Sequence, residues 1–178
     1  RSDWYRDNVY RTFEWREKSR KQGAKILSKR QVKLDTKPQI IINELLKTMD
    51  ISYINEQIYT YYAVDNYLDK ENLIIEVMGD YWHSNPLIYD SKLNSMQIKR
   101  IYKDKTKHTY IAKYYNIEIL YLWENDIYNR LDVCKELIKI YIANHGILTN
   151  YHSFNYKLNE GKLELKNEII KPYFEATE

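Results

Sequence analysis

Two strand-like segments joined by a short polar turn constrain the fold of this 178-residue chain more than any other feature. The segments are Tyr62–Leu68 and Leu73–Met78, and the polar run 69–72 separates them. Apolar runs of this length around a polar turn are typical of a β-hairpin. Each run is interrupted by one acidic residue, Asp65 in the first and Glu76 in the second. Pairing about the turn is therefore expected to bring the two carboxylates to neighbouring positions.

The segments around this hairpin predict an α/β domain, a small mixed β-sheet flanked by helices. Pro38 suits a first helical position after a cap from Asp35 or Thr36, and apolar residues at helical spacing follow up to Met49. The other expected elements are strands over residues 53–58 and 118–123, helices over residues 95–115 and 127–144, and a hairpin between residues 153 and 165. That C-terminal hairpin could extend the sheet or form a separate flap.

Charge is distributed unevenly along the chain. The formal net charge is +3, but residues 1–37 hold 12 Lys and Arg against 5 Asp and Glu, a net +7. Residues 38–178 hold 16 against 20, a net −4. Such a basic segment is typical of an arm that contacts nucleic acid. Its expected phosphate contacts are Arg6, Arg11, Arg16, Arg20, Lys21, Lys25, Lys29, Arg30 and Lys33.

The alternative for this arm is an amphipathic helix that docks on the protein through Trp4, Val9, Phe13 and Trp15, and both roles can hold together. The chain then divides into a basic arm or helix over residues 1–37, a core over residues 38–150, and a C-terminal hairpin extension over residues 151–178.

Composition excludes several classes of protein. No apolar run is long enough for a transmembrane helix, so we expect no membrane partner. The single cysteine, Cys134, excludes a disulfide framework and a cysteine-based zinc site. The chain has 19 tyrosines, a residue that can stack on bases. Because Ile, Asn and Lys are abundant too, we interpret the tyrosine excess mainly as the product of an A/T-rich coding sequence.

The two strand acids point to a metal site. A buried carboxylate is costly unless it is paired or holds a metal. Two carboxylates and a main-chain carbonyl form an oxygen site of the kind that Mg²⁺ prefers. A bend at Gly79 would bring His83 back over Asp65 and Glu76, where a histidine can exchange a proton with an attacking water or a leaving oxygen. The alternative is a pair of solvent-facing edge carboxylates with His83 as an ordinary loop residue.

Three stretches of the chain resemble the PD-(D/E)XK nuclease superfamily. They are INELLKTMDISYINEQ, YYAVDNYLDKENLIIEVMGDYWHSNP and DKTKHTYIAKYYNIEILYLWENDIY, within roughly residues 38–130. Within the superfamily, the likeness is to the very-short-patch-repair (Vsr-like) branch and to phage homing endonucleases of the EDxHD type. The resemblance implies a restriction-endonuclease-like or Vsr-like fold, cleavage of double-stranded DNA, and Mg²⁺ as the cofactor, with Mn²⁺ as a substitute.

The resemblance also implies roles for individual residues. Asp65 matches the central metal ligand and Glu76 the acid of the second strand, with the Val77 carbonyl as a further ligand. His83 matches the histidine that follows an aromatic pair, and Glu44 matches the helix glutamate that faces the site.

Two further residues have candidate roles. Asp104, in the helix before the fourth strand, is the candidate for the last acidic residue of the pattern. Trp82 could insert at a base step of DNA, as apolar wedges do, or pack beneath its own loop.

The chain departs from the superfamily at one position. The superfamily's catalytic lysine would fall two residues after Glu76, where Met78 stands. This departure is similar to the Vsr-like branch, in which a histidine takes over proton transfer, and so favours His83 for that role. If His83 were dispensable, Lys105 or Lys107 would be the next candidate for it.

The expected function is therefore a homing-type endonuclease in the cytoplasm of a bacterial host, encoded there or by a phage, which could act as a homodimer. The alternatives are a mismatch-repair or restriction nuclease of the same fold, a catalytically decayed DNA-binding subunit, and an RNA-directed nuclease or defence-system effector.

Overall fold

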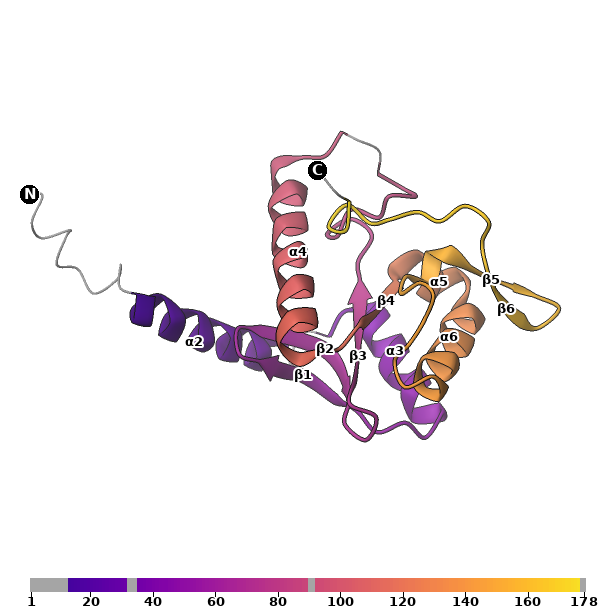
Figure 1. Ribbon diagram of the computed structural model, residues 1–178, viewed down its shortest axis with the longest axis horizontal. Coiled ribbons are helices and arrows are strands. Elements are labelled where there is room, and N and C mark those ends of the chain that lie inside the picture. Colours follow the sequence, from indigo (N-terminus) through magenta and orange to yellow (C-terminus); the bar gives the residue numbers. More distant parts are fainter. Residues whose placement is uncertain (1–12, 32–34, 90–91, 177–178) are drawn as a thin grey trace, which may run out of the picture.

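The computed structural model describes residues 13–31, 35–89 and 92–176 of the chain (Figure 1). The elements in chain order are α2 (Phe13–Gln31), α3 (Lys37–Thr48), β1 (Ile54–Tyr59), β2 (Tyr62–Leu68), β3 (Leu73–Met78), α4 (Ser95–Tyr115), β4 (Ile119–Trp123), α5 (Glu124–Asn129), α6 (Leu131–Ala143), the 3₁₀ helix η2 (Ser153–Asn155), β5 (Tyr156–Asn159) and β6 (Lys162–Leu165). The predicted fold class is confirmed, since a mixed sheet is flanked by helices and followed by a C-terminal hairpin. Among the described helices, none combines the length and the apolar character that crossing a membrane would need.

The main sheet has four strands in the order β1-β2-β3-β4, and it is buried at its centre. β1, β2 and β3 pair antiparallel, whereas β4 runs parallel to β3 because α4 forms the crossover between them. All six residues of β3 are buried, which indicates a strand covered on both faces.

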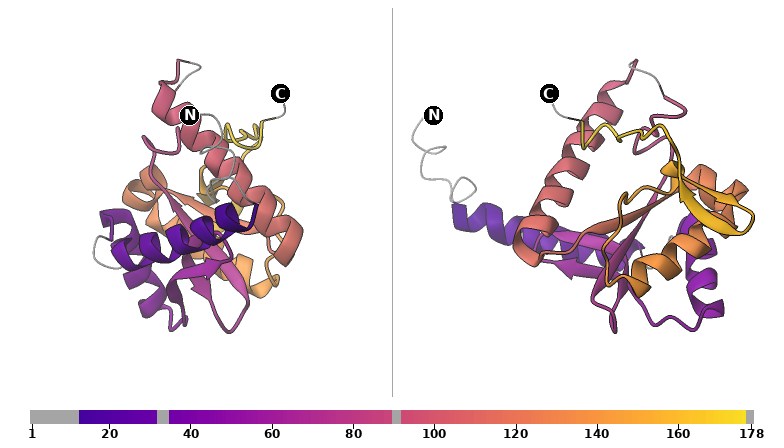
Figure 2. Two further views of the ribbon diagram at one scale, coloured as in Figure 1. Left: turned by 90° about the vertical axis from the view of Figure 1, so that its left-hand side faces the viewer. Right: turned by 45° about the vertical axis from the view of Figure 1, so that its right-hand side comes forward.

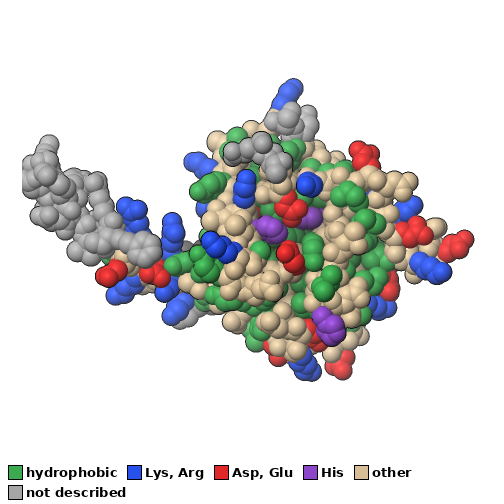
Figure 3. Space-filling view, viewed as in Figure 1, with side chains coloured by type: hydrophobic (Ala, Val, Ile, Leu, Met, Phe, Trp, Pro, Cys, Tyr) green, Lys and Arg blue, Asp and Glu red, His purple; other side chains and the backbone are tan. Residues whose placement is uncertain are grey.

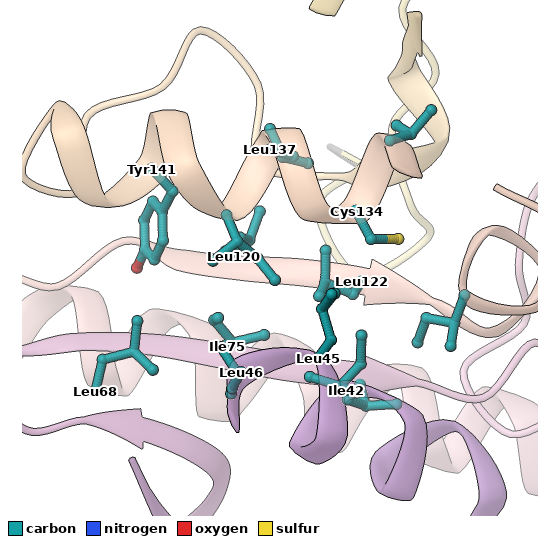
Figure 4. Packing of buried hydrophobic residues seen from close by; sticks show 14 of the residues in the cluster. Ile42, Leu45, Leu46, Leu68, Ile75, Leu120, Leu122, Cys134, Leu137 and Tyr141 are labelled. Carbon is teal, nitrogen blue, oxygen red and sulfur yellow. The ribbon is translucent and has the colours of Figure 1, made fainter. Parts of the chain in front are cut away.

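The two faces of the sheet have separate hydrophobic cores. On one face, side chains of α3 and α6 such as Ile42 and Leu137 meet Ile75 and Leu120 of the strands (Figure 4). On the other face, Ile111 of α4 packs with Ile74 and Ile119. The views in Figure 2 show α4 on the opposite side of the sheet from α3 and α6.

Local signals define several element ends. Thr36 and Gln39 form the capping box at the start of α3, which resolves the choice between Asp35 and Thr36 as the cap. Asn116 ends α4 in the left-handed conformation, with φ 55° and ψ 41°, as predicted from its position.

The single helix predicted over residues 127–144 is two helices in the structure. α5 and α6 meet at Arg130, whose φ of −144° and ψ of 50° are not helical. The guanidinium of Arg130 donates to Asp126 Oδ1 at 3.1 Å and to the Tyr156 carbonyl at 2.8 Å. The break is therefore fixed by contacts with β5, which apolar spacing along one helix cannot reveal.

The C-terminal residues form a separate two-stranded sheet and part of the core. β5 and β6 pair only with each other among the described strands, so the hairpin is a flap rather than an extension of the main sheet. Before and after it, Phe154 and Phe174 are buried in the core on the α4 face. Near the end of the chain, Glu175 Oε1 lies 2.8 Å from Nε2 of the buried His152.

Candidate functional site

The structure brings Asp65 and Glu76 side by side on β2 and β3. The β2–β3 ladder runs from Leu68 paired with Leu73 to Asn66 paired with Ile75, and Asp65 and Glu76 occupy the next two positions. There the regular pairing ends, and the Asp65 N–H is directed at Glu76 Oε1, 3.4 Å away. The two carboxylates therefore lie where the strands begin to separate.

The Asp65 carboxylate is held by hydrogen bonds to both of its oxygens. Gln39 Nε2, in the first turn of α3, donates to Oδ1 at 3.0 Å, and the Val77 N–H donates to Oδ2 at 2.8 Å. Gln39 is itself fixed, because its Oε1 accepts from the Thr36 N–H at 2.9 Å in the capping box. The side chain of Val77 is buried in the core, so both donors are rigidly placed.

Glu76 is buried and paired with a lysine of α4. Lys107 Nζ lies 2.6 Å from Glu76 Oε1, and the two side chains are 20% and 8% exposed. The pKa of Glu76 is raised to about 8, because burial, helped by the charge of Asp65, outweighs the lowering effect of Lys107. The carboxylate of Glu76 is thus in a place where a negative charge is favourable only with a nearby cation.

A third acid, Glu56, occupies the same row of the sheet on β1. Its neighbours Asn55 and Gln57 pair with Asn66 and Val64, which places Glu56 opposite Asp65. Glu56 is buried and has a φ of 55°, a left-handed conformation that side chains with a Cβ rarely adopt. Burial and, to a smaller extent, the charge of Asp65 raise the pKa of Glu56 to about 7. Three carboxylates therefore lie on three neighbouring strands.

His83 is tied to the same region through α4. His83 Nδ1 lies 2.6 Å from Asp104 Oδ2, and both side chains are about one-tenth exposed. Arg100 approaches both partners at 3.4 Å, its Nη2 toward His83 Nε2 and its Nε toward Asp104 Oδ1. Asp104 and Lys107 are three residues apart and so project from the same side of α4.

The bend that positions His83 is a turn after β3. The His83 N–H donates to the Gly79 carbonyl at 2.9 Å, and Ser84 adopts a φ of 54°. Gly79 is not among the glycines with positive φ, so the bend uses Ser84 rather than the conformational freedom of glycine. The loop is fixed at its base, because the Asp80 N–H donates to Glu124 Oε2 at 2.9 Å.

Tyr121 of β4 lies beside Glu76 in the sheet. It is the partner of Glu76 in the parallel β3–β4 ladder, and its hydroxyl lies 2.9 Å from His108 Nδ1 of α4. Burial raises the pKa of Tyr121, and the charge of Glu76 adds to the rise. Behind it, the rings of His152 and Phe174 pack against Tyr121 at centroid distances of 4.9 and 5.3 Å. On the face drawn in Figure 3, acidic and histidine side chains gather at the centre, with Lys and Arg side chains around them.

The expectation that Glu44 faces the site is wrong. The Glu44 side chain is 62% exposed and pairs with Lys47 at 2.7 Å. α3 turns Ile42, Leu45 and Leu46 into the core, so Glu44 falls on the opposite side of the helix. Gln39 is the α3 residue that reaches Asp65.

The predicted nucleic-acid contacts lie partly within the described residues. Arg16, Arg20, Lys21 and Lys25 are exposed on α2, and the α2 backbone includes Lys29 and Arg30. Arg6, Arg11 and Lys33 lie outside the described residues, as do Trp4 and Val9 of the docking alternative. Trp82 is 58% exposed, so it does not pack beneath its own loop.

Gln39 and Glu56 have no role in the sequence prediction, although signals for both are present. Gln39 stands three residues after a capping threonine, where a side chain is fixed at the start of a helix. Glu56 is an acid inside a strand, as Asp65 and Glu76 are. Its sequence neighbours are polar, however, so it stands out less than an acid within an apolar run.

The donor set fits a divalent cation that prefers oxygen ligands. Among the described residues, no group of three or more His, Cys, Asp or Glu side chains is arranged so that it could hold a metal ion. Asp65 and Glu76 nevertheless offer adjacent carboxylate oxygens, and Glu56 lies opposite Asp65 on the neighbouring strand β1. Lys107 offsets part of this negative charge, and a divalent cation would offset more.

The buried acids predict a stability that falls as pH rises. A group whose pKa is raised by folding binds its proton more tightly in the folded state, so its contribution is lost as pH rises through the folded value. For Glu56, whose pKa is about 7, roughly 3 kcal/mol of unfolding free energy should be lost between about pH 4.5 and pH 8 in EDTA. Chemical denaturation at several pH values would measure this loss. Glu56→Gln should reduce the slope of unfolding free energy against pH.

Glu44→Gln is the matched control for this measurement, because it removes an exposed acid and should leave the slope unchanged. A slope that Glu56→Gln does not alter would show that Glu56 is not a buried, charge-disfavoured group.

Comparisons with known proteins find a weak likeness among solved structures and none elsewhere. No model of a protein family matches the chain, and a search of curated proteins finds no match either. Among solved structures, the catalytic domain of the homing endonuclease I-Bth0305I is similar, with 27% sequence identity over 62% of this chain and 98% of that chain. The TM-score of this comparison is 0.47.

Proposed function

We propose that this chain is a metal-dependent endonuclease that hydrolyses phosphodiester bonds of double-stranded DNA. The observation that carries the proposal is the adjacency of Asp65 and Glu76 in the sheet, with Lys107 on Glu76 and the His83–Asp104 pair on the same helix side. Phosphodiester hydrolysis needs groups that neutralise charge on the phosphate and a group that carries a proton. These residues supply both.

Asp65 and Glu76 would hold Mg²⁺, or Mn²⁺ in its place, and the Val77 carbonyl is the proposed third ligand. When bound, the metal would neutralise the negative charge that develops on the phosphate. The hydrogen bonds from Gln39 and the Val77 N–H orient the Asp65 carboxylate before any ligand arrives. Such fixed orientation is what a metal ligand needs from its surroundings.

His83 is the proposed proton carrier. With Nδ1 hydrogen-bonded to Asp104, the proton of the neutral ring resides on Nδ1 and the lone pair on Nε2. Nε2, which Arg100 Nη2 approaches at 3.4 Å, can then accept the proton of the attacking water once Arg100 turns to the phosphate. The Lys107 ammonium, held against Glu76, can donate to a phosphate oxygen, as a lysine commonly does in phosphate sites.

We favour a homing-type enzyme with a Vsr-like fold in the PD-(D/E)XK superfamily, acting in the cytoplasm, with a mismatch-repair or restriction nuclease as the alternatives. Arg16, Arg20, Lys21 and Lys25 of α2 would contact DNA phosphates, and the exposed Trp82 would contact bases. A decayed DNA-binding subunit is less consistent with the site, because Lys107 supplies the ammonium that Met78 lacks.

Cleavage of supercoiled plasmid DNA tests the proposal. We expect nicked or linear product with Mg²⁺ or Mn²⁺ and none in EDTA, because the buried acids require a cation to hold an anionic phosphate. Single-stranded DNA and RNA of the same sequence, assayed in parallel, should be poorer substrates. Salt-dependent DNA binding without cleavage in any divalent metal would reject the nuclease in favour of the decayed subunit, and preferred cleavage of RNA would reject DNA as the substrate.

A further inference from the structure

The negative net charge of residues 38–178 conceals a second basic helix. α4 holds six Lys and Arg against a single Asp, a net +5, and α2 holds seven against two Glu, also a net +5. The outward side of α4 is open to solvent, since Lys99, Lys103 and Lys105 are exposed and Tyr102 is 73% exposed. A long, exposed and strongly cationic helix fits a polyanionic partner.

Most cations of α4 follow one flank of the helix, and this flank borders the proposed active site. Arg100, Lys103, Lys107 and Tyr110 recur at spacings of three and four residues, which aligns them along one side. At one end of the flank Arg100 contacts the His83–Asp104 pair, and further along Lys107 contacts Glu76. Lys99, one position before Arg100, extends the flank outward.

Tyrosines join this flank to α2. Tyr110 of α4 packs against Tyr61 and Tyr62 at the β1–β2 turn, both at a centroid distance of 5.3 Å. The Tyr61 hydroxyl then donates to Glu17 Oε1 of α2 at 3.0 Å. Both helices approach this end of the sheet in Figures 1 and 2.

Cations from both helices reach the junction. Burial raises the pKa of Tyr62, and Arg20 of α2 and Lys107 of α4 both oppose that rise, so charges from both helices act on one ring. Some of the tyrosines thus have a structural use that an A/T-rich coding sequence does not explain.

We infer that α2 and α4 form one continuous surface for the backbone of duplex DNA, joined at Tyr61, Tyr62 and Tyr110. This two-helix surface rests on the proposed function for its substrate. From Arg100 to Lys107 the α4 flank spans about 10 Å, which equals the axial rise of roughly three base pairs of duplex DNA. The same flank carries Lys107 and borders His83, so a strand held along it passes the acids of the site. α2 extends the contact beyond the sheet and supplies further phosphate contacts.

DNA binding by paired-charge variants tests this surface. All variants carry Asp65→Asn, so that binding is measured without cleavage. Fluorescence anisotropy with a labelled duplex, over a series of salt concentrations, gives the affinity and its salt dependence. Lys99→Ala with Lys103→Ala removes two cations from α4, and Arg16→Ala with Arg20→Ala removes two from α2. The matched control is Lys135→Ala with Lys139→Ala, two exposed lysines of α6.

We expect each pair on α4 and α2 to weaken binding by roughly tenfold and to reduce the slope of log K against log salt by about 1 to 2. The two effects should add when the pairs are combined, because both helices hold the same duplex. The α6 control should bind as the parent does, and thermal unfolding should be unchanged in every variant because the replaced side chains are exposed.

Unchanged affinity and slope after the α4 replacements would overturn the inference, as would a combined loss no larger than that of one pair. The inference would also be overturned if the α4 and α2 replacements weakened binding to single-stranded RNA but not to duplex DNA. This binding experiment can fail independently of the cleavage assay that tests the proposed function. DNA cleavage by the wild type with an ineffective α4 pair would reject the surface alone, whereas α4-dependent binding without wild-type cleavage would keep the surface and reject the nuclease.

Discussion

Asp65→Asn is expected to slow DNA cleavage by this chain about a thousandfold without unfolding it. The asparagine keeps the shape of the side chain and can still accept one of the two hydrogen bonds from Gln39 and the Val77 N–H. It removes the negative charge that a divalent metal requires. A loss of roughly 4 kcal/mol of transition-state stabilisation corresponds to about a thousandfold lower rate of plasmid cleavage.

Two measurements separate a lost metal site from a lost fold. Calorimetric titration with Mn²⁺ should show weaker binding to the Asp65→Asn chain, while circular dichroism should show the same secondary structure. Glu44→Gln is the matched control, because it removes an acid that is exposed and paired with Lys47 rather than with the site. Wild-type cleavage rates in Asp65→Asn would reject Asp65 as the central ligand.

The central hairpin could be predicted from sequence because its signals are local. Two apolar runs, a four-residue polar turn and one acid in each run define the adjacency of Asp65 and Glu76. The register of a hairpin follows from its turn, so the partner of each strand residue can be counted. The break at Arg130 escapes such counting, because it depends on a contact with Tyr156, 26 residues further along the chain.

The error at Glu44 has a different origin. The helical spacing that predicts Ile42, Leu45 and Leu46 as core also places Glu44 away from it, so the periodicity alone contained the correct answer. The resemblance to a nuclease family assigned Glu44 against that periodicity. Dividing the charge at residue 37 likewise hid α4, because the acids of the sheet and the loops cancel its cations in any sum over residues 38–178.

His83→Ala is expected to reduce the cleavage rate by about 10²- to 10⁴-fold, the usual contribution of a general acid or base. Asp104→Asn should reduce it less, because the ring of His83 remains but loses the carboxylate that fixes its proton on Nδ1. Since the two residues act as one unit, the double variant should cleave no more slowly than His83→Ala alone. Single-turnover rates at saturating DNA would measure all three variants.

Lys107→Met tests the competing hypothesis that Lys107, rather than His83, transfers the proton. The Lys107 ammonium lies 2.6 Å from Glu76 Oε1. Lys107 is therefore well placed to replace the catalytic lysine that the superfamily has at the position of Met78. If His83→Ala cleaves DNA nearly as fast as the wild type while Lys107→Met does not, proton transfer belongs to Lys107 and not to the His83–Asp104 pair. If His83→Ala is the slower variant, Lys107 serves to neutralise Glu76 and the phosphate. Its replacement should then weaken DNA binding as well as the rate, because a contact made in the bound state is lost along with one made in the transition state.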